Sequence, residues 1–312
     1  MDIKTLLTAL DSTSVSSTCV LKIMGSFIGH AVPGSIFLFI SIWSFIGTLI
    51  RKHQNTKPRR GLLRSSGTTC ARLKTHAPVW YPCPGKTLSK IPLEPIFKVL
   101  CAFVGVLGEL FLHQSWRLIG KNGEFVEDNV NNHSHAAMYC FFGLSGVVDL
   151  VMWYGIIPLP LMTDYVIISA SFWIEGFLFY FHLQGHSEIS VRLHVILYIV
   201  IFITAALFLA DVFFTQHHSL FSLIRAVLIA VQGSWFYQIA FVLYGPNPWK
   251  NTPKNVEVLP IAFAWHLFIF LILSFVFVAV FNRFCGKKYT RDNQLDEEIS
   301  DEETEDIPLK ST

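Results

Sequence analysis

The sequence predicts an all-α, polytopic membrane protein of about seven transmembrane helices. Of its 312 residues, 52% are hydrophobic and only 15% are charged, whereas soluble domains carry about a quarter charged residues. The apolar residues fall in blocks of roughly 20, the length that crosses the hydrocarbon core as a helix. Strand-like alternation is absent. Helices, rather than a closed barrel, are therefore expected to satisfy the backbone hydrogen bonds in lipid.

Proline and glycine residues separate these apolar blocks into spans. Pro158 and Pro160 interrupt one connection, and a cluster that begins at Gly245 interrupts another. The second span is the least apolar, since it contains Lys98 and Glu109. The predicted spans are residues 27–50, 95–113, 133–154, 164–183, 193–214, 220–244 and 258–284.

The net charge of +2 conceals a strong asymmetry along the chain. Residues 51–90 contain ten Lys or Arg residues and no acid, and residues 296–306 contain eight acids and no base. Because basic loops stay on the cytoplasmic side, the 51–90 loop is expected there, as a flexible segment. An odd number of spans then places the N-terminus outside or in a lumen and the C-terminus in the cytoplasm.

We expect three parts: an N-terminal extension over 1–23, a seven-helix membrane domain over 24–284, and an acidic, disordered cytoplasmic tail over 285–312. Whether translation starts at Met1 or at Met24 stays open. The six cysteines are scattered and indicate neither a disulfide framework nor a metal motif. Candidate modification sites are Asn132 for glycosylation, Cys285 for palmitoylation, and Ser300 and Thr304 for an acidophilic kinase.

Ionisable side chains inside the predicted spans are the most informative residues, because a charge in a bilayer is costly. With the topology above, most of them fall in the outer half of the bundle. Glu175 and the histidine seven residues later share one helix face. The sequence therefore predicts a polar pocket in the outer half, formed by His30, Glu109, His135, Glu175, His182, His194 and His266.

Three interpretations of this pocket remain open. The histidines and carboxylates have the chemistry to ligate zinc or haem in a membrane enzyme, either a lipid hydrolase or an electron-transfer protein. They also have the chemistry to relay protons in a proton-coupled transporter. Under the third interpretation the protein is a non-enzymatic adaptor or scaffold, and these groups only hold helices together. Whether the chain is an enzyme is left undecided.

A second polar group is predicted nearer the cytoplasmic side. Asp149, Asp211 and Arg225 fall at similar depths in three different spans. Two acids and one base at one depth are typical of a structural ion-pair lock between helices.

Several short motifs together resemble the transmembrane protein 45 family, which includes the transmembrane epididymal proteins. They are GHAVPGS (29–35), HAAMY (135–139), FFG (141–143), SGVVD (145–149), EGFLFY (175–180), QGSWF (232–236) and WH (265–266). The resemblance implies a multi-pass protein of about seven helices with no established activity. The matching motifs contain or lie next to His30, His135, His182 and His266. Residues 1–23 and 53–90 depart from the family pattern.

The predicted partners are membrane lipids, with no nucleic acid and with protein partners unknown. No strong retrieval signal is visible in the sequence. We therefore expect the plasma membrane or the Golgi and endosomal membranes as the location.

Overall fold

The computed structural model describes residues 27–52, 78–83, 87–112, 116–181, 183 and 185–305. Within residues 112, 127–128 and 285–305 only the backbone is described. The predicted extension over 1–23, the Met24 start, most of the basic loop and His182 lie outside this part of the chain. The chain divides into two compact units between Leu267 and Phe268, and the bundle described below belongs to the first unit.

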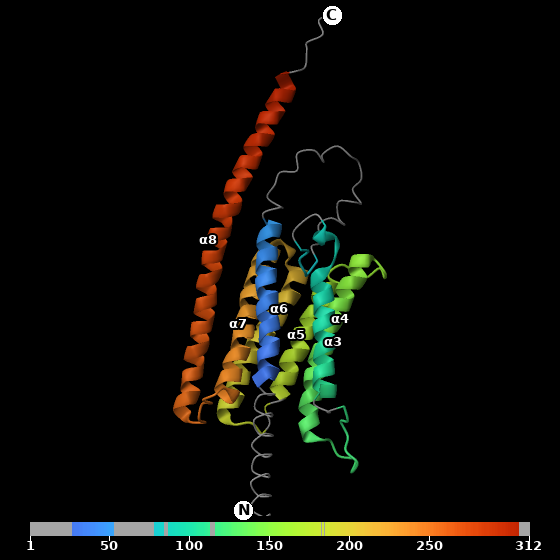
Figure 1. Cartoon of the computed structure of the whole chain (residues 1–312), viewed down its shortest axis with the longest axis vertical. Coiled ribbons are helices and arrows are strands. Elements are labelled where there is room, and N and C mark those ends of the chain that lie inside the picture. Colours follow the sequence, from blue (N-terminus) through green and yellow to red (C-terminus); the bar gives the residue numbers. More distant parts are fainter. Residues whose placement is uncertain are drawn as a thin grey trace, which may run out of the picture. The chain divides into compact units, whose positions relative to one another are not determined.

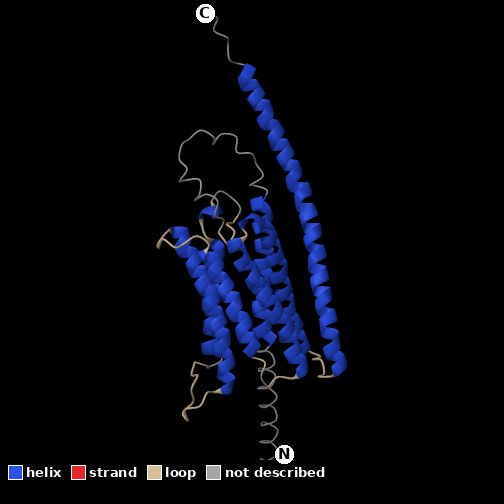
Figure 2. Cartoon of the chain, turned by 180° about the vertical axis from the view of Figure 1, so that it is seen from behind, coloured by secondary structure: helices blue, strands red, loops and turns tan. Residues whose placement is uncertain are grey.

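The described residues form helices and loops (Figure 2). Outside the helices, backbone pairing between strands in this part of the chain is limited to one isolated bridge between Ile119 and Phe125. The long helices are Phe27–Lys52, α3 (Leu93–Leu107), α4 (Glu127–Tyr154), α5 (Thr163–Phe181), α6 (Glu188–Phe213), α7 (His218–Tyr244) and α8 (Pro253–Glu305). A π-helical turn, η2 (Gly108–Leu112), extends α3.

The predicted all-α membrane fold is confirmed. Six helices in the described part of the chain are long and apolar enough to cross a membrane. They are Phe27–Lys52, Asn129–Tyr154, Thr163–Phe181, Glu188–Phe213, Thr215–Tyr244 and Pro253–Phe284. The other predicted span corresponds to α3, whose 15 residues are continued by the five of η2. Their combined length approaches the roughly 20 residues that a crossing requires.

One expectation differs from the structure at the C-terminal end. The acidic segment was expected to be disordered from residue 285, whereas α8 continues as one helix to Glu305. Pro260 lies near the start of α8, and the sequence contains no proline between Pro260 and Pro308. Proline is the strongest helix breaker, so the part of α8 after the apolar segment contains no residue of that kind.

The helices of the bundle have roughly aligned axes (Figure 1). Neighbours in sequence from α3 to α7 contact one another in turn. The Phe27–Lys52 helix contacts both α7 and α3, so these contacts form a closed series. Its Ser41 hydroxyl donates to the Ala226 carbonyl of α7 at 2.6 Å, and its Phe39 ring lies 5.0 Å from the Phe97 ring of α3.

A glycine pair sets the distance between the Phe27–Lys52 helix and α7. A Cβ atom placed on Gly233 would lie 2.8 Å from the carbonyl oxygen of Gly34. The two backbones are therefore as close as the absence of side chains permits, as is typical of helix pairs in membranes.

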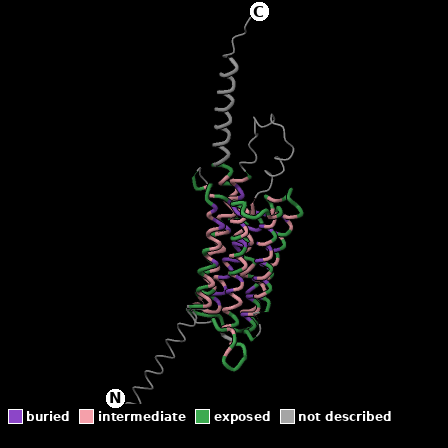
Figure 3. Tube along the Cα trace, turned by 90° about the vertical axis from the view of Figure 1, so that its right-hand side faces the viewer, coloured by how far each residue is buried: buried purple, intermediate pink, exposed green. Residues whose placement is uncertain are grey.

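The outer surface of the bundle is apolar, as a lipid-facing surface requires. Exposed positions lie on the outer faces and loops, whereas buried positions lie toward the inside (Figure 3). Phe177 of α5 is 54% exposed and Ile203 of α6 is 49% exposed. The inside contains most of the buried polar groups, among them Asp149, Glu175 and Asp211.

Candidate functional site

A cavity of about 150 Å³ lies between the Phe27–Lys52 helix, α3, α4 and α5. At one end it is lined by His30, Glu109 and His135, which we call the His30 end. At the other it is lined by Ser44, Val79 and Glu94, the Glu94 end. The 14 residues from His30 to Ser44 span about 21 Å at a helical rise of 1.5 Å per residue. The cavity thus extends over roughly two thirds of the 30 Å hydrocarbon core.

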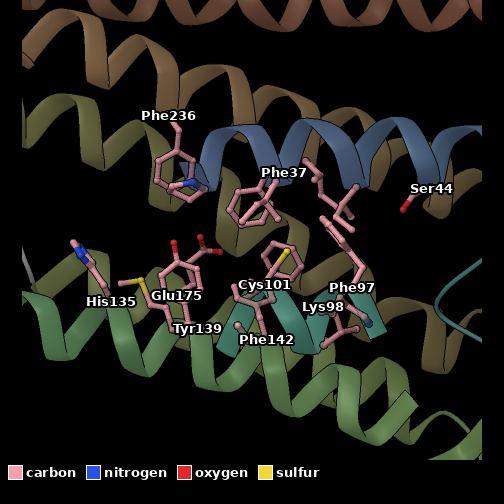
Figure 4. Close-up of a pocket in the computed structure, with 18 of the residues that line it drawn as sticks. Phe37, Ser44, Phe97, Lys98, Cys101, His135, Tyr139, Phe142, Glu175 and Phe236 are labelled. Carbon is pink, nitrogen blue, oxygen red and sulfur yellow. The ribbon is translucent and has the colours of Figure 1, made fainter. Parts of the chain in front are cut away.

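Glu175 lies between the two ends of the cavity. Figure 4 shows its carboxylate pointing into the space between the Phe27–Lys52 helix and α4, beside the side chain of Tyr139. The residue is only 3% exposed. Its Oε2 atom has no hydrogen-bond partner in the described part of the chain. A buried carboxyl oxygen without a partner is costly, and among the described residues that line the cavity Glu175 has such an oxygen.

At the His30 end, the structure brings together three of the predicted pocket residues. The His135 Nδ1 atom lies 3.4 Å from Glu109 Oε1, so α4 and η2 are joined by an ion pair when the histidine is protonated. His30 faces the same cavity from the Phe27–Lys52 helix. The irregular backbone of η2 positions Glu109, in keeping with the frequent occurrence of π-helical turns at functional sites.

Two other predicted pocket residues do not line the cavity. His194 is 2% exposed and donates from Nδ1 to the Ser190 carbonyl at 2.8 Å. Its ring contacts the ring of His30 edge to face, with the two centroids 5.8 Å apart. His266 lies 2.8 Å from the Ser234 hydroxyl and packs edge-on against Trp235.

The predicted metal chemistry has no ligand set in the described part of the chain. No three His, Cys, Asp or Glu side chains among these residues are grouped so that they could hold a metal ion. His30 and His194 are in direct ring contact, which leaves no space for a haem plane between that pair. His182, the remaining predicted ligand, lies outside the described residues.

At the Glu94 end, the carboxylates bind the backbone of a folded loop segment. Asp164 Oδ2 accepts from the Val79 N–H at 2.9 Å, and Glu94 Oε2 accepts from the Tyr81 N–H at 2.8 Å. Arg51 donates to the carbonyl of Trp80 at 2.9 Å and lies over the Tyr81 ring. These contacts fix residues 78–83, the 78–83 segment, against this end of the cavity.

The 78–83 segment corrects the expectation that the whole 51–90 loop is flexible. Trp80 is 2% exposed and Tyr81 is 4% exposed, so both are core residues. The Thr48 hydroxyl donates to the Tyr81 hydroxyl at 2.7 Å, and Trp80 packs on Trp153 of α4. Burial of two large aromatic side chains outweighs the polar composition of the surrounding loop. The segment lies at the Glu94 end of the cavity, where Val79 is part of the lining.

The predicted ion-pair lock is divided between two places. Arg225 of α7 forms an ion pair with Asp211 of α6, and both are almost fully buried. Asp149 is not part of this group. It pairs instead with Lys98 of α3, because α3 lies against α4. Asp149 and Asp211 are therefore each matched by a base from an adjacent helix.

The Asp211–Arg225 pair extends toward the 78–83 segment. His218 Nδ1 lies 3.4 Å from Asp211 Oδ2, and His218 Nε2 lies 3.5 Å from the Arg51 guanidinium. Since Arg51 also donates to carbonyls of the 78–83 segment, one chain of polar contacts joins α6 and α7 to the Glu94 end of the cavity.

The candidate modification sites are only partly described. Asn132 lies in the second turn of helix α4, and its glycosylation stays a prediction. Cys285, Ser300 and Thr304 lie on the backbone of α8, but their side chains are outside the described residues.

The sequence reasoning missed several residues of the cavity. Tyr139, Glu94 and Cys101 line it but were not singled out, and Lys98 was noted only because it weakened a predicted span. Glu94 and Lys98 are four residues apart on α3, a spacing that places both on one helix face. That signal was present in the sequence.

Two comparisons with known proteins agree with the architecture. Residues 162–279 match the model of a family described as "Family of unknown function (DUF716)". The chain is 22% identical over 256 residues to transmembrane epididymal protein 1 of Rattus norvegicus, covering 79% of this chain and 77% of the relative. It is 23% identical over 139 residues to transmembrane epididymal protein 1A of Mus musculus, covering 43% of this chain and 45% of the relative.

These similarities agree with the resemblance to the transmembrane protein 45 family that the sequence motifs indicated. The chain is a multi-pass membrane protein. The part matched by the family model includes Glu175 together with α6 and α7.

Proposed function

We propose that the protein is a proton-coupled membrane transporter in which Glu175 carries the proton. The observation that supports this most directly is the position of Glu175, which is buried, faces the central cavity, and has an Oε2 atom without a hydrogen-bond partner among the described residues. An ionised carboxylate in an apolar interior requires either a proton or a positively charged partner. If that positively charged partner is the transported solute, a carboxylate that binds the proton and the solute in turn couples the movement of one to the movement of the other.

The shape of the cavity supports passage rather than static packing. It follows the Phe27–Lys52 helix for about 21 Å, which is roughly two thirds of the hydrocarbon core. Ionisable side chains line both of its ends, and Glu175 lies between them. Carboxylates and histidines in this arrangement are typical of proton relays in membrane proteins.

The 78–83 segment supplies the closed end that such a cycle needs. A transporter must keep one end of the passage shut while the other admits solute. The segment is held by hydrogen bonds to side chains on three different helices, through Arg51, Glu94 and Asp164. A change in the relative positions of those helices would break several of these contacts together, so opening is expected to be cooperative.

The two other interpretations receive less support. A zinc enzyme has no ligand set in the described residues. An adaptor or scaffold predicts that replacing Glu175 alters stability alone. We keep the plasma membrane and the Golgi and endosomal membranes as the proposed locations of the transport activity.

Solute-driven proton movement in reconstituted vesicles tests this function. The protein is incorporated into liposomes that contain a pH-sensitive dye, and gradients of three phenyl compounds are imposed in turn. They are trimethyl(2-phenylethyl)ammonium, 2-phenylethanesulfonate and phenyl glucoside, which differ in charge. We expect at least one gradient to drive a change of internal pH, and E175Q to abolish that change.

The matched control is Glu188→Gln at the start of α6. Glu188 is exposed and forms only a long contact of 3.9 Å with Arg192, so the control removes a carboxylate that lies outside the cavity. E188Q should transport like the unmodified protein. Equal proton movement in E175Q and E188Q, or none with any of the three compounds in the unmodified protein, would contradict the proposed function.

A further inference from the structure

We infer that the solute is an organic cation with an apolar body, an amine or a quaternary ammonium compound, which replaces the proton on Glu175. This inference rests on the proposed function and names its substrate class. It is carried by the charges that line the cavity and by the aromatic rings around Glu175.

The ionisable groups of the cavity favour a positive ligand. Its lining contains three carboxyl groups, from Glu94, Glu109 and Glu175, and one lysine, Lys98. Lys98 is already paired with the buried Asp149. No arginine is among the lining residues. The described lining therefore has more carboxyl groups than lysines and arginines, and an anion would meet no unpaired positive charge of Lys or Arg there.

Several aromatic rings line the same cavity as Glu175. Phe172 and Phe179 flank it on α5, and Phe37, Phe142 and Phe236 face the same cavity. The rings contact one another, with centroids 5.7 Å apart for Phe37–Phe236 and 5.1 Å apart for Phe142–Phe172.

Such a set of aromatic faces attracts cations through the ring quadrupoles, most strongly in a site from which water is excluded. A carboxylate enclosed by rings is the usual combination for recognising ammonium groups, because the carboxylate supplies the charge and the rings accept the attached carbons. The Tyr139 hydroxyl beside Glu175 adds a polar contact within the same space.

The exchange on Glu175 balances as a proton transfer. In the empty state the carboxyl group holds a proton. When the cation enters, the proton leaves to water at the open end, and the carboxylate forms an ion pair with the cation. The cavity then closes at that end and opens at the other, where the cation departs and a proton from the solution on that second side returns to the carboxylate. One proton therefore moves in the direction opposite to one monovalent cation.

The other titratable groups that face the cavity are spread over several helices. They are His30 on the Phe27–Lys52 helix, Glu94, Lys98 and Cys101 on α3, Glu109 on η2, and His135 and Tyr139 on α4. The residues of α6 and α7 that line it are Phe208, Ile229 and Phe236, none of which titrates. His194 of α6 contacts the His30 ring but is not among the residues that line the cavity. Among these groups Glu175 combines burial with the unpartnered carboxyl oxygen, so the exchange is assigned to it.

Binding to the full-length protein purified in detergent tests the substrate class. The three probes are trimethyl(2-phenylethyl)ammonium, 2-phenylethanesulfonate and 2-phenylethanol, which share a phenylethyl group and carry positive, negative and no charge. We expect the ammonium compound to bind most tightly. We expect E175Q to weaken its binding about tenfold to a hundredfold, the range for loss of a charged interaction in a buried site.

Two variants separate a binding role from a structural one. E175D retains the carboxylate and should retain most of the ammonium binding, whereas E188Q should bind like the unmodified protein. All variants are compared by their gel-filtration profiles. Preference for the sulfonate, or ammonium binding that E175Q leaves unchanged, would overturn the inference. The proposed transport function would still stand if the sulfonate or the glucoside drove proton movement through Glu175 in vesicles.

Discussion

Replacing Arg225 with leucine is expected to lower the free energy of unfolding by about 3–5 kcal/mol. Arg225 and Asp211 are both buried, with side chains 5% and 0% exposed. The guanidinium also donates to the Ser222 hydroxyl at 2.9 Å and lies over the Phe208 ring. Without it, the Asp211 carboxylate is left in an apolar interior next to only His218. The loss therefore reflects an uncompensated buried charge more than a missing attraction.

Thermal unfolding in detergent measures this effect, and a double substitution tests its cause. A loss of this size should lower the unfolding temperature by about 6 °C or more. Arg225→Leu combined with Asp211→Leu removes both charges and should recover much of the loss. The control is Arg192→Leu, since Arg192 is 60% exposed and its removal should cost less than about 1 kcal/mol. Equal losses in the Arg225 and Arg192 variants would contradict the assignment.

Replacing Trp80 with alanine is expected to cost about 3–5 kcal/mol and to open the Glu94 end of the cavity. Trp80 is 2% exposed and packs edge-on against Trp153, with ring centroids 5.2 Å apart. Its loss leaves a void where the 78–83 segment meets α4. The neighbouring Val79 lines the cavity, so the substitution should also loosen the closure there.

Cys101 offers a direct readout of this opening, because it lines the cavity and is a free cysteine. In a variant that retains Cys101 as the single cysteine, a water-soluble maleimide should label it faster after Trp80→Ala. The control is Trp116→Ala, which removes a tryptophan that is 58% exposed. Labelling of Cys101 at the same rate in both variants would show that the 78–83 segment does not close the cavity.

The sequence was sufficient to predict the helices because the length of an apolar block is a local property. Each predicted span corresponds to a helix in the structure, and the residue types on the outer faces follow from contact with lipid. The limits of α8 were less predictable. Its charged residues after Phe284 were expected to be disordered, yet a continuous helix needs only the absence of strong breakers.

The candidate site was predictable only in part, because membrane depth does not determine which face of a helix points inward. Depth grouped His30, His135 and Glu175, which line the cavity, together with His194 and His266, which are not among the lining residues. Helix rotation is set by tertiary packing, which one sequence does not reveal.

The pairing of Lys98 with Asp149 was missed for the same reason. The contact depends on which helix lies next to α4, and that helix is α3 rather than one carrying Asp211 or Arg225. The 78–83 segment was missed because two aromatic residues in a basic, polar loop give no periodic signal, although together they fill the end of the bundle.

Infrared spectroscopy of the carboxyl groups tests the central claim, that Glu175 exchanges its proton for a cation in the cavity. A protonated carboxyl group has a carbonyl band that the ionised form lacks. We predict such a band in the unmodified protein and in E188Q, and its absence in E175Q. The band should disappear as the pH rises, and trimethyl(2-phenylethyl)ammonium should move that disappearance to lower pH, because the cation binds the ionised form. A Glu175 band that neither pH nor the ammonium compound alters would contradict the claim.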